Sequence, residues 1–222
     1  MSLIRVGKDN TLIIDTETTG VPKNDWKDWS ECYAVQIAYI IVDNDYKIIK
    51  SCNELIKDTN HPSLPEPLSI HHITEEMRNE KGISIYEFLY SFEQDIRDFN
   101  VKNIVSHSTY FDVGLIYREA FRNNYNIAYL NRLSFYDTKL SPIYIKSRPA
   151  NLSRCVELNE LPINYVGKPH DAFYDVFLCQ ALYRATEPKA IMKRNSFYSI
   201  KHVFTPNELK IAKFWRVPYG RH

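Results

Sequence analysis

The sequence predicts an α/β fold in which a mixed β-sheet is flanked by α-helices. Three apolar stretches rich in β-branched residues follow one another within the first 56 residues, and helical and extended patterns alternate from there to about residue 185. Strands followed by alternating helices and strands are typical of a mixed sheet covered by helices. Of the 222 residues, 44% are hydrophobic and 14% aromatic, which suffices for one sizeable core or two small ones and excludes a disordered protein.

The first three expected strands lie close together in the chain. The run that begins at Thr11 ends in a Thr/Gly break at Gly20, a pattern typical of a strand that enters a turn. The segments Ala34–Asp43 and Lys47–Ile56 are the second and third expected strands. The short link between them, residues 44–46, suits a hairpin.

The rest of the chain alternates between helical spacing and short apolar runs. In residues 84–99, apolar side chains recur every three or four positions with acids between them, which predicts an amphipathic helix. The other expected elements are helices at residues 112–123, 151–158 and 171–185 and strands at Asn103–Ser106 and Ser134–Thr138. The stretch His61–Pro67 is expected to be a loop, and Thr205 is expected to cap the start of a last helix.

Two classes of protein are excluded by the composition. No run approaches the roughly 18 uninterrupted apolar residues that a membrane helix needs, and the N-terminus lacks the layout of a secretory signal. We therefore expect an intracellular protein with no membrane contact. The four cysteines lie far apart, so neither a zinc ribbon nor a disulfide scaffold is expected; they are Cys32, Cys52, Cys155 and Cys179.

The net charge of +1 hides an uneven distribution. Residues 188–222 hold eight Lys or Arg and one acid, so they carry +7, and the other residues must sum to −6. An acidic body with a basic end is typical of a protein that holds cations in one place and a polyanion beside them, but a solvated tail gives the same count. We expect one domain at residues 1–187 and a basic C-terminal extension at 188–222 that packs on it.

Two acidic residues mark the end of the first expected strand. Asp15 and Glu17 are two positions apart, so their side chains point to the same face of the sheet. Like charges placed this close are favoured where a hard divalent cation such as Mg²⁺ or Mn²⁺ is bound by carboxylate oxygens. The structural alternative is that one residue caps the turn while the other faces solvent.

Two further acidic positions follow later in the chain. Asp112 comes shortly after the expected strand at residues 103–106, and Asp175 stands near His170 at the start of an expected helix. Each is weak evidence when taken singly, because Asp112 also suits a helix N-cap and His170 also suits an exposed position after Pro169. Together with the first pair they form a set of carboxylates with a histidine beside it.

Three short strings in this set resemble the exonuclease motifs of the DEDD superfamily. The string IIDTETTG resembles the first motif, HSTYFD is similar to the second, and HDAFYD matches the HxAxxD third motif of the DEDDh branch. Their order and spacing agree with the family, and the resemblance spans Thr11 to about Arg184. The string IHHIT at residues 70–74 is also similar to the IHGIT stretch of polymerase-proofreading exonucleases.

The resemblance implies a ribonuclease H-like fold and a 3′-5′ exonuclease that depends on two Mg²⁺ or Mn²⁺ ions. Such an enzyme hydrolyses phosphodiester bonds at a nucleic-acid 3′ end and releases 5′-nucleoside monophosphates, and two metals suit the anionic phosphate. The metal ligands that it implies are Asp15, Glu17, Asp112 and Asp175. His170 is the implied general base, since a histidine can take a proton from water near neutral pH.

The sequence departs from the family pattern at two positions. Ser108 stands where the second motif usually has Asn, and His72 stands where IHGIT has Gly. Neither position is a metal ligand, so the departures bear on substrate detail. Beside the motifs, His107 is expected to support the strand end rather than to act in catalysis, and Asp137 and Asp171 are expected to be structural.

Three residues are expected to contact the substrate. Thr18 and the backbone after Glu17 are expected to meet the terminal nucleotide. Lys193 and Arg194, in the basic extension, are expected to meet phosphates. The aromatic residues of that extension are expected to dock it on the domain rather than to stack on bases.

The identity of the nucleic acid stays open at this point. The IHHIT string favours DNA proofreading or repair, with a single-stranded 3′ end as substrate and a polymerase or repair complex as candidate partner, in the cytoplasm, nucleoid or nucleus. An RNA or oligoribonucleotide 3′-trimming exonuclease is the alternative, because no single residue in the sequence indicates whether the 2′-hydroxyl of RNA is recognised. A catalytically silent nucleic-acid-binding module and a nuclease that cuts internally are further alternatives; the presence of all five site residues argues against the silent module.

Overall fold

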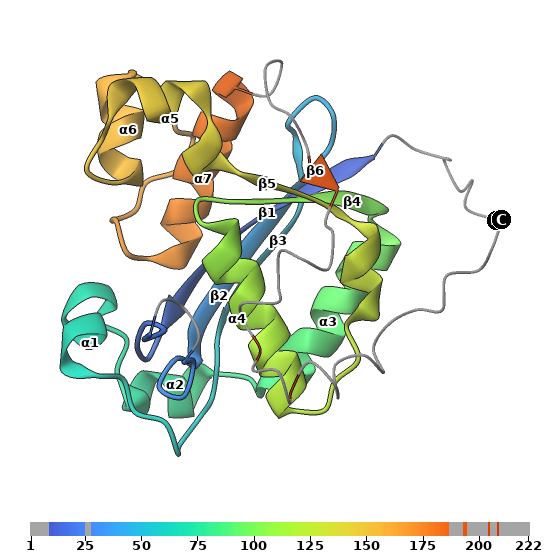
Figure 1. Cartoon of the computed structure of the whole chain (residues 1–222), viewed down its shortest axis with the longest axis vertical. Coiled ribbons are helices and arrows are strands. Elements are labelled where there is room, and N and C mark those ends of the chain that lie inside the picture. The colour runs from blue at the N-terminus through green and yellow to red at the C-terminus, as the bar shows by residue number, and fades with distance from the viewer. Residues whose placement is uncertain (1–8, 25–27, 187–192, 195–203, 205–207, 209–222) are drawn as a thin grey trace, which may run out of the picture.

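The described residues of the computed structural model, 9–24, 28–186, 193–194, 204 and 208, form a mixed sheet with helices on both faces (Figure 1). The strands lie in the order β3-β2-β1-β4-β5-β6. Their bounds are β1 Asn10–Thr18, β2 Ala34–Val42, β3 Ile48–Leu55, β4 Val101–Ser106, β5 Ser134–Asp137 and β6 Lys193–Arg194. Strand β1 is antiparallel to β2 and parallel to β4, and β5 is parallel to β4, so the predicted α/β fold with a mixed sheet is confirmed.

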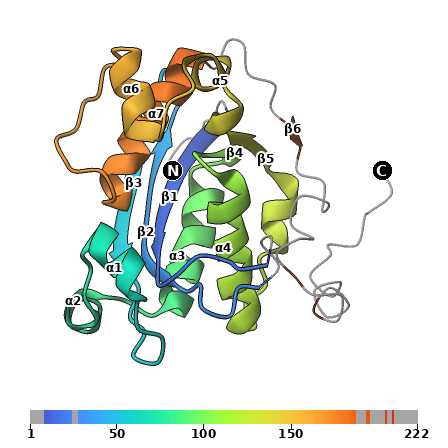
Figure 2. The same cartoon turned by 60° about the vertical axis from the view of Figure 1, so that its left-hand side comes forward.

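Alternate residues of β1 face two separate hydrophobic clusters. Leu12 and Ile14 point into a cluster with α3 (Ile85–Asp98) and α4 (Thr109–Arg122). Ile13 points into a cluster with α6 (Leu152–Leu158) and α7 (Ala172–Thr186). In Figures 1 and 2 the green helices α3 and α4 cover one face and the orange helix α7 covers the other. The central strands are therefore buried on both sides, as the apolar run of β2 indicates.

The start of α4 is decided by a residue from another strand. The expected helix began at residue 112, but α4 begins at Thr109. The carboxylate of Asp137, at the end of β5, accepts a hydrogen bond from the Thr109 amide at 3.1 Å and so caps the helix. Asp112 consequently lies in the first turn, and its alternative interpretation as the N-cap is wrong.

Three short helices were not predicted. Residues 61–67 were expected to be a loop, but α1 (Pro65–His71) begins within them, with Pro65 at its first position. The helices α2 (Glu75–Lys81) and α5 (Pro142–Ser147) are equally short. A helix of six or seven residues shows at most two turns of periodicity, so its pattern gives little signal. No helix among the described residues is long and apolar enough to cross a membrane.

The described residues of the basic extension lie against the domain. Phe204 is 5% exposed, and its ring meets Phe121 edge-on with 5.4 Å between centroids. Glu208 forms an ion pair with Arg118 at 2.9 Å, and β6 extends the sheet beside β5. Residues 205–207, with the expected helix start, lie outside the described residues, and the division of the chain at residue 187 stays a prediction.

His72 ends α1 in a backbone conformation that favours glycine. Its φ of 58° lies in the left-handed region, and its amide donates to the Leu68 carbonyl at 2.9 Å, as in an αL C-cap. A side chain with a Cβ is strained in this region. The Gly of the IHGIT pattern is therefore explained by backbone geometry at this position.

We predict that His72→Gly raises the free energy of unfolding by up to about 1 kcal/mol, because relief of the left-handed strain exceeds the added entropy of the unfolded chain. Chemical denaturation followed by circular dichroism measures this change. Glu76→Gly, at an exposed position inside α2, is the matched control and should instead lower stability by about 1 kcal/mol. Equal losses in both variants would contradict the strain at His72.

Candidate active site

The C-terminal ends of the parallel strands β1, β4 and β5 meet at one edge of the sheet. Asp15 and Glu17 lie at the end of β1 and, by the alternation of the strand, face the same side as Ile13, towards α7. His107 directly follows β4, and Asp137 ends β5 opposite Ser106. Open α/β sheets bind ligands at such strand ends, so the edge is the natural position for a site.

Asp112 reaches this edge from the opposite face of the sheet. It lies in the first turn of α4 and is 2% exposed. The Thr16 hydroxyl, on the α4 side of β1, donates to its Oδ1 at 2.8 Å. This bond ties the carboxylate to β1 between Asp15 and Glu17, so that side chains from both faces converge at the strand end.

The start of α7 supplies the last two members of the set. Asp175 lies in the first turn of α7, and its Oδ2 accepts a hydrogen bond from the His170 amide at 3.0 Å. His170 has a φ of 66°, so this bond holds a strained loop residue in place. One ligand atom each from Glu17, His170 and Asp175 lie within 4.8 Å of one another.

A pocket of about 200 Å³ lies where these elements meet. Its acidic and imidazole lining is contributed by β1, α4, α7 and the segments before the two helices: Asp15, Asp112, Asp175, His107 and His170. The remaining lining comes from Thr16, Ser108, Phe111, Pro169 and the beginning of α6 at residues 151–153. The structure thus brings all five sequence-predicted residues, Glu17 included, to one place, while their catalytic roles stay a prediction.

The pKa values of the four carboxyl groups are raised, so that their charged forms are disfavoured. Burial, followed by repulsion from Asp175 and Asp112, raises the pKa of Glu17 to about 8. Burial raises the pKa of Asp112 to about 7, against the hydrogen bond from Thr16, and that of Asp175 to about 6, against the His170 amide. The pKa of Asp15 is raised well above its usual value by burial and by Asp112, Asp175 and Glu17.

This donor set fits divalent cations. Four carboxylates buried close together form a site of high negative potential, and a bound cation would offset the repulsion that adds to the raised pKa values of Asp15 and Glu17. Carboxylate oxygens are the ligands that Mg²⁺ and Mn²⁺ prefer. The close group of Glu17, His170 and Asp175 has the size of a single coordination sphere.

The residues expected to be structural make structural contacts. Asp137 caps α4, and the Asp171 carboxylate accepts from the Phe173 amide at the start of α7. The Thr138 hydroxyl donates to the Ser106 carbonyl, so the 2.8 Å contact between His107 Nδ1 and Thr138 Oγ1 requires the imidazole to donate. Burial, with a smaller contribution from Lys139, lowers the pKa of His107 to about 3, so it is a neutral group that supports the strand end.

Gln36 is a positioning residue that sequence reasoning missed. It is 6% exposed and pairs opposite Glu17 in the sheet. Its side-chain amide donates to Asp171 at 3.0 Å, and its carbonyl accepts from the Ala172 amide at 3.1 Å. Gln36 therefore anchors the start of α7 beside Glu17. The sequence did contain a signal for this role, because Gln36 is the one amide side chain in the otherwise apolar strand AVQIAYIIV.

The three residues expected to contact the substrate do not line the pocket as the site residues do. The Thr18 hydroxyl is buried and donates to the Gly20 carbonyl at 2.7 Å, so a nucleotide contact here would fall to the backbone. Lys193 and Arg194 pair with Phe135 and Ser134, in the half of β5 away from Asp137. Their contact with phosphates stays a prediction.

Comparison with known proteins identifies the family. The exonuclease family model (RNase_T) matches residues 12–183, which include all five residues of the site. The chain belongs to this exonuclease family of the DEDD superfamily. No curated protein sequence matches the chain.

Solved structures of exonucleases share the fold. E. coli Exonuclease I in complex with a dT13 oligonucleotide matches with a TM-score of 0.64 and 17% identity over 82% of this chain and 42% of that one. Exonuclease I from Methylocaldum szegediense matches with a TM-score of 0.60 and 21% identity over 82% and 41%. Cell-death related nuclease 4 matches with a TM-score of 0.61 and 19% identity, over 83% of this chain and 66% of that one. The chain spans about two fifths of the Exonuclease I chains, and the ribonuclease H-like fold is confirmed.

We predict that Asp15→Asn stabilises the metal-free protein at pH 8 by about 1 kcal/mol or more, and by less at pH 5. A carboxyl group whose pKa is higher in the folded than in the unfolded state lowers stability as pH rises. The loss begins near the unfolded pKa, about 4, and continues up to the folded pKa, which is between about 6 and 8 for Glu17, Asp112 and Asp175. Removing one charge relieves the others over that window.

Denaturant unfolding in EDTA at the two pH values measures the effect. Asp45→Asn, in the exposed turn between β2 and β3, is the matched control and should change stability equally little at both. A stability difference for Asp15→Asn that is the same at pH 5 and pH 8 would show that Asp15 is not repelled by its neighbours.

Proposed function

We propose that this chain is a metal-dependent 3′-5′ exonuclease of the DEDDh type that releases 5′-nucleoside monophosphates from single-stranded nucleic acid. The observation that carries the proposal is the convergence of Asp15, Glu17, Asp112 and Asp175 with His170 beside them at one end of the sheet. Family membership supports the nuclease chemistry. The direction of digestion and the product belong to the proposal.

Single-stranded DNA is the substrate that the comparisons favour. Several similar structures are complexes of E. coli Exonuclease I with the oligonucleotides dT13 or dA16. The IHHIT string points the same way, towards proofreading or repair, with a polymerase or repair complex as partner. RNA is the alternative substrate, and recognition of the 2′-hydroxyl would distinguish the two.

The four carboxylates would hold two Mg²⁺ or Mn²⁺ ions. When bound, such ions neutralise the phosphate charge, acidify the attacking water and stabilise the leaving oxygen. The chain itself holds the ligands in place: Thr16 orients Asp112, and Gln36 ties the start of α7 to the sheet beside Glu17. The carboxylates thereby stay close together despite their repulsion, ready to bind a cation.

His170 would act as the general base. Its imidazole lies within 4.8 Å of carboxylate oxygens of Glu17 and Asp175 and is exposed, so a water near these oxygens can give its proton to a ring nitrogen. The bond from its amide to Asp175 keeps the ring at the rim of the pocket. Asp175 would thus serve both as a cation ligand and as the brace of the base.

An assay on end-labelled linear DNA, linear RNA and circular single-stranded DNA, with Mg²⁺ or Mn²⁺, tests the proposal. We predict stepwise release of mononucleotides from the 3′ ends of linear strands and no cleavage of the circle. Asp175→Asn should abolish release and keep the loop, since an amide oxygen still accepts from the His170 amide. Cleavage of the circle would favour an internal nuclease, and binding without any cleavage would favour the silent module.

We predict that His170→Ala lowers turnover by roughly 10²–10⁴-fold while Mn²⁺ binding is largely retained, because a base is lost and the four carboxylates remain. Turnover under saturating substrate and titration of Mn²⁺ measure the two effects. A parallel loss of Mn²⁺ binding would make His170 a ligand, and near-wild-type turnover would exclude it as the base.

A further inference from the structure

A short turn between β5 and α5 lies against the pocket. The 3₁₀ turn Thr138–Leu140 follows Asp137, and Thr138 contacts His107 Nδ1 at 2.8 Å and Cys179 of α7 at 3.8 Å. In Figure 1 the yellow connection between β5 and α5 passes next to α7 and the beginning of α4. Lys139, in the middle of this turn, is therefore held beside the acidic edge of the sheet.

One carboxylate fixes Lys139 relative to Asp112. Asp137 accepts a hydrogen bond from the Lys139 amide through Oδ1 at 2.9 Å and from the Thr109 amide through Oδ2 at 3.1 Å. Thr109 begins the helix whose first turn contains Asp112. The backbone of Lys139 is thus tied to the helix turn that carries a site carboxylate.

The ammonium group of Lys139 is available for an anion. Lys139 is exposed, and it forms no ion pair within 4 Å with any residue that the structure describes. Its positive charge opposes the rise of the pKa of Asp15 and of Asp112. A cation near an acidic site, without an ion pair in the described part of the chain, is explained if the substrate is a polyanion.

Lys139 and His170 come to the site from different elements. His170 is grouped with Glu17 and Asp175 at the start of α7, whereas Lys139 is tied to the β5 and α4 side with Asp112. In an in-line displacement at phosphorus, the attacking and leaving oxygens are on opposite sides. If His170 serves the attacking water from the start of α7, the leaving oxygen and the strand attached to it would lie towards the β5 and α4 side, to which Lys139 is tied.

We propose that Lys139 binds a phosphate of the strand that is retained when the terminal nucleotide is released. This role rests on the proposed function, because it takes the attack side from His170. Lys139 would contact the substrate through its ammonium and the backbone phosphate, without regard to base sequence. It would orient the strand without taking part in the transfer of a proton.

The proposal predicts two effects of opposite sign. Loss of the cation removes one phosphate contact, which for a single strand contributes a slope of about 0.7 in log affinity against log salt, or about fivefold at 0.1 M salt. Loss of the same cation beside Asp15 and Asp112 removes repulsion for Mn²⁺ and should tighten its binding by roughly threefold. Damage to the site would instead weaken both.

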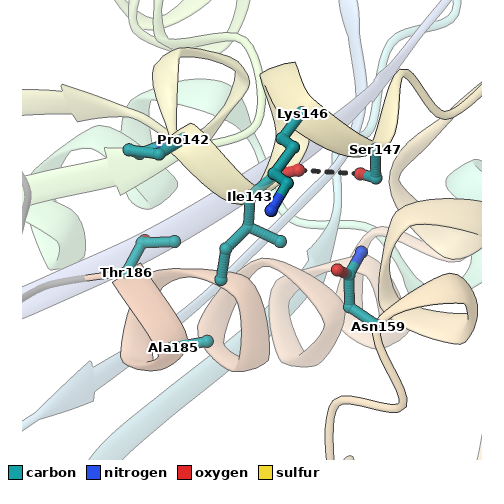
Figure 3. A pocket seen from close by; sticks show the side chains of 7 residues that line it. All are labelled: Pro142, Ile143, Lys146, Ser147, Asn159, Ala185 and Thr186. Carbon is teal, nitrogen blue, oxygen red and sulfur yellow. Dashed lines mark hydrogen bonds between the residues drawn. The ribbon is translucent and has the colours of Figure 1, made fainter.

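The experiment compares Lys139→Met and Lys139→Arg with wild type in the full chain. Single-stranded DNA and RNA of about 12 nucleotides are bound in Ca²⁺ across a salt series, Mn²⁺ alone is titrated without oligonucleotide, and hydrolysis is measured separately. Lys146→Met is the matched control. Figure 3 shows Lys146 in a pocket with Ala185 and Thr186, at the C-terminal end of α7, whereas the candidate site is at its N-terminal end.

We expect Lys139→Met to bind the preferred oligonucleotide about fivefold more weakly with a flatter salt slope, and to bind Mn²⁺ more tightly. Lys139→Arg should keep the wild-type slope, and Lys146→Met should change neither quantity. An unchanged slope in Lys139→Met, or weak binding by both Lys139 variants alike, overturns the proposal. If wild type binds the oligonucleotide without hydrolysing it, and Lys139→Met still weakens that binding, the proposed exonuclease activity is refuted while the phosphate contact of Lys139 is supported.

Discussion

The burial of four carboxylates close together, near the C-terminal end of β1, is the constraint on which the rest of this structure depends. Asp15, Glu17, Asp112 and Asp175 each have a raised pKa, and in each case burial is the largest cause. A folded chain gains nothing from such a cluster by itself, because desolvation and like charge both oppose it. The cluster must therefore be held together by interactions elsewhere in the fold.

Hydrogen bonds from uncharged donors hold the cluster together. Thr16 ties Asp112 to β1, Gln36 ties the start of α7 to the sheet, and Asp137 caps α4 from β5. The first bond joins two elements that each bring a site carboxylate, and the other two fix α7 and α4 to neighbouring strands. The site is thus braced by partners that do not themselves neutralise it, which leaves its negative potential for a cation.

A buried ionic network supports the segment that follows the site. Arg78 is fully buried and donates to the Ile56 carbonyl at 2.9 Å, and Arg122 donates to the Cys32 carbonyl at 2.7 Å and to Glu119 at 3.0 Å. Glu119 in turn accepts from the Ala34 amide at the start of β2. The bonds of Arg122 and Glu119 satisfy backbone groups between β1 and the start of β2, and Arg78 satisfies a carbonyl directly after β3.

The sequence by itself determined the main elements and the members of the site. The apolar runs and helical spacings of β1, β2, β3, α3 and α7 are long enough to show their period, and the motif strings contain the four carboxylates and the histidine that converge at the strand end. Alternation in β1 was enough to place Asp15 and Glu17 on one face. These properties are local, and a linear pattern records them directly.

Only the tertiary structure decided the features that depend on partners far apart in the chain. The three-residue earlier start of α4 needs Asp137, the anchoring of α7 needs Gln36, and the strain of His72 needs the end of a helix too short to be predicted. The tie between the backbone of Lys139 and the start of α4 likewise follows from the two hydrogen bonds that Asp137 accepts. Hydrogen bonds between distant residues leave no periodic trace in a sequence, because their partners are brought together only when the sheet has formed.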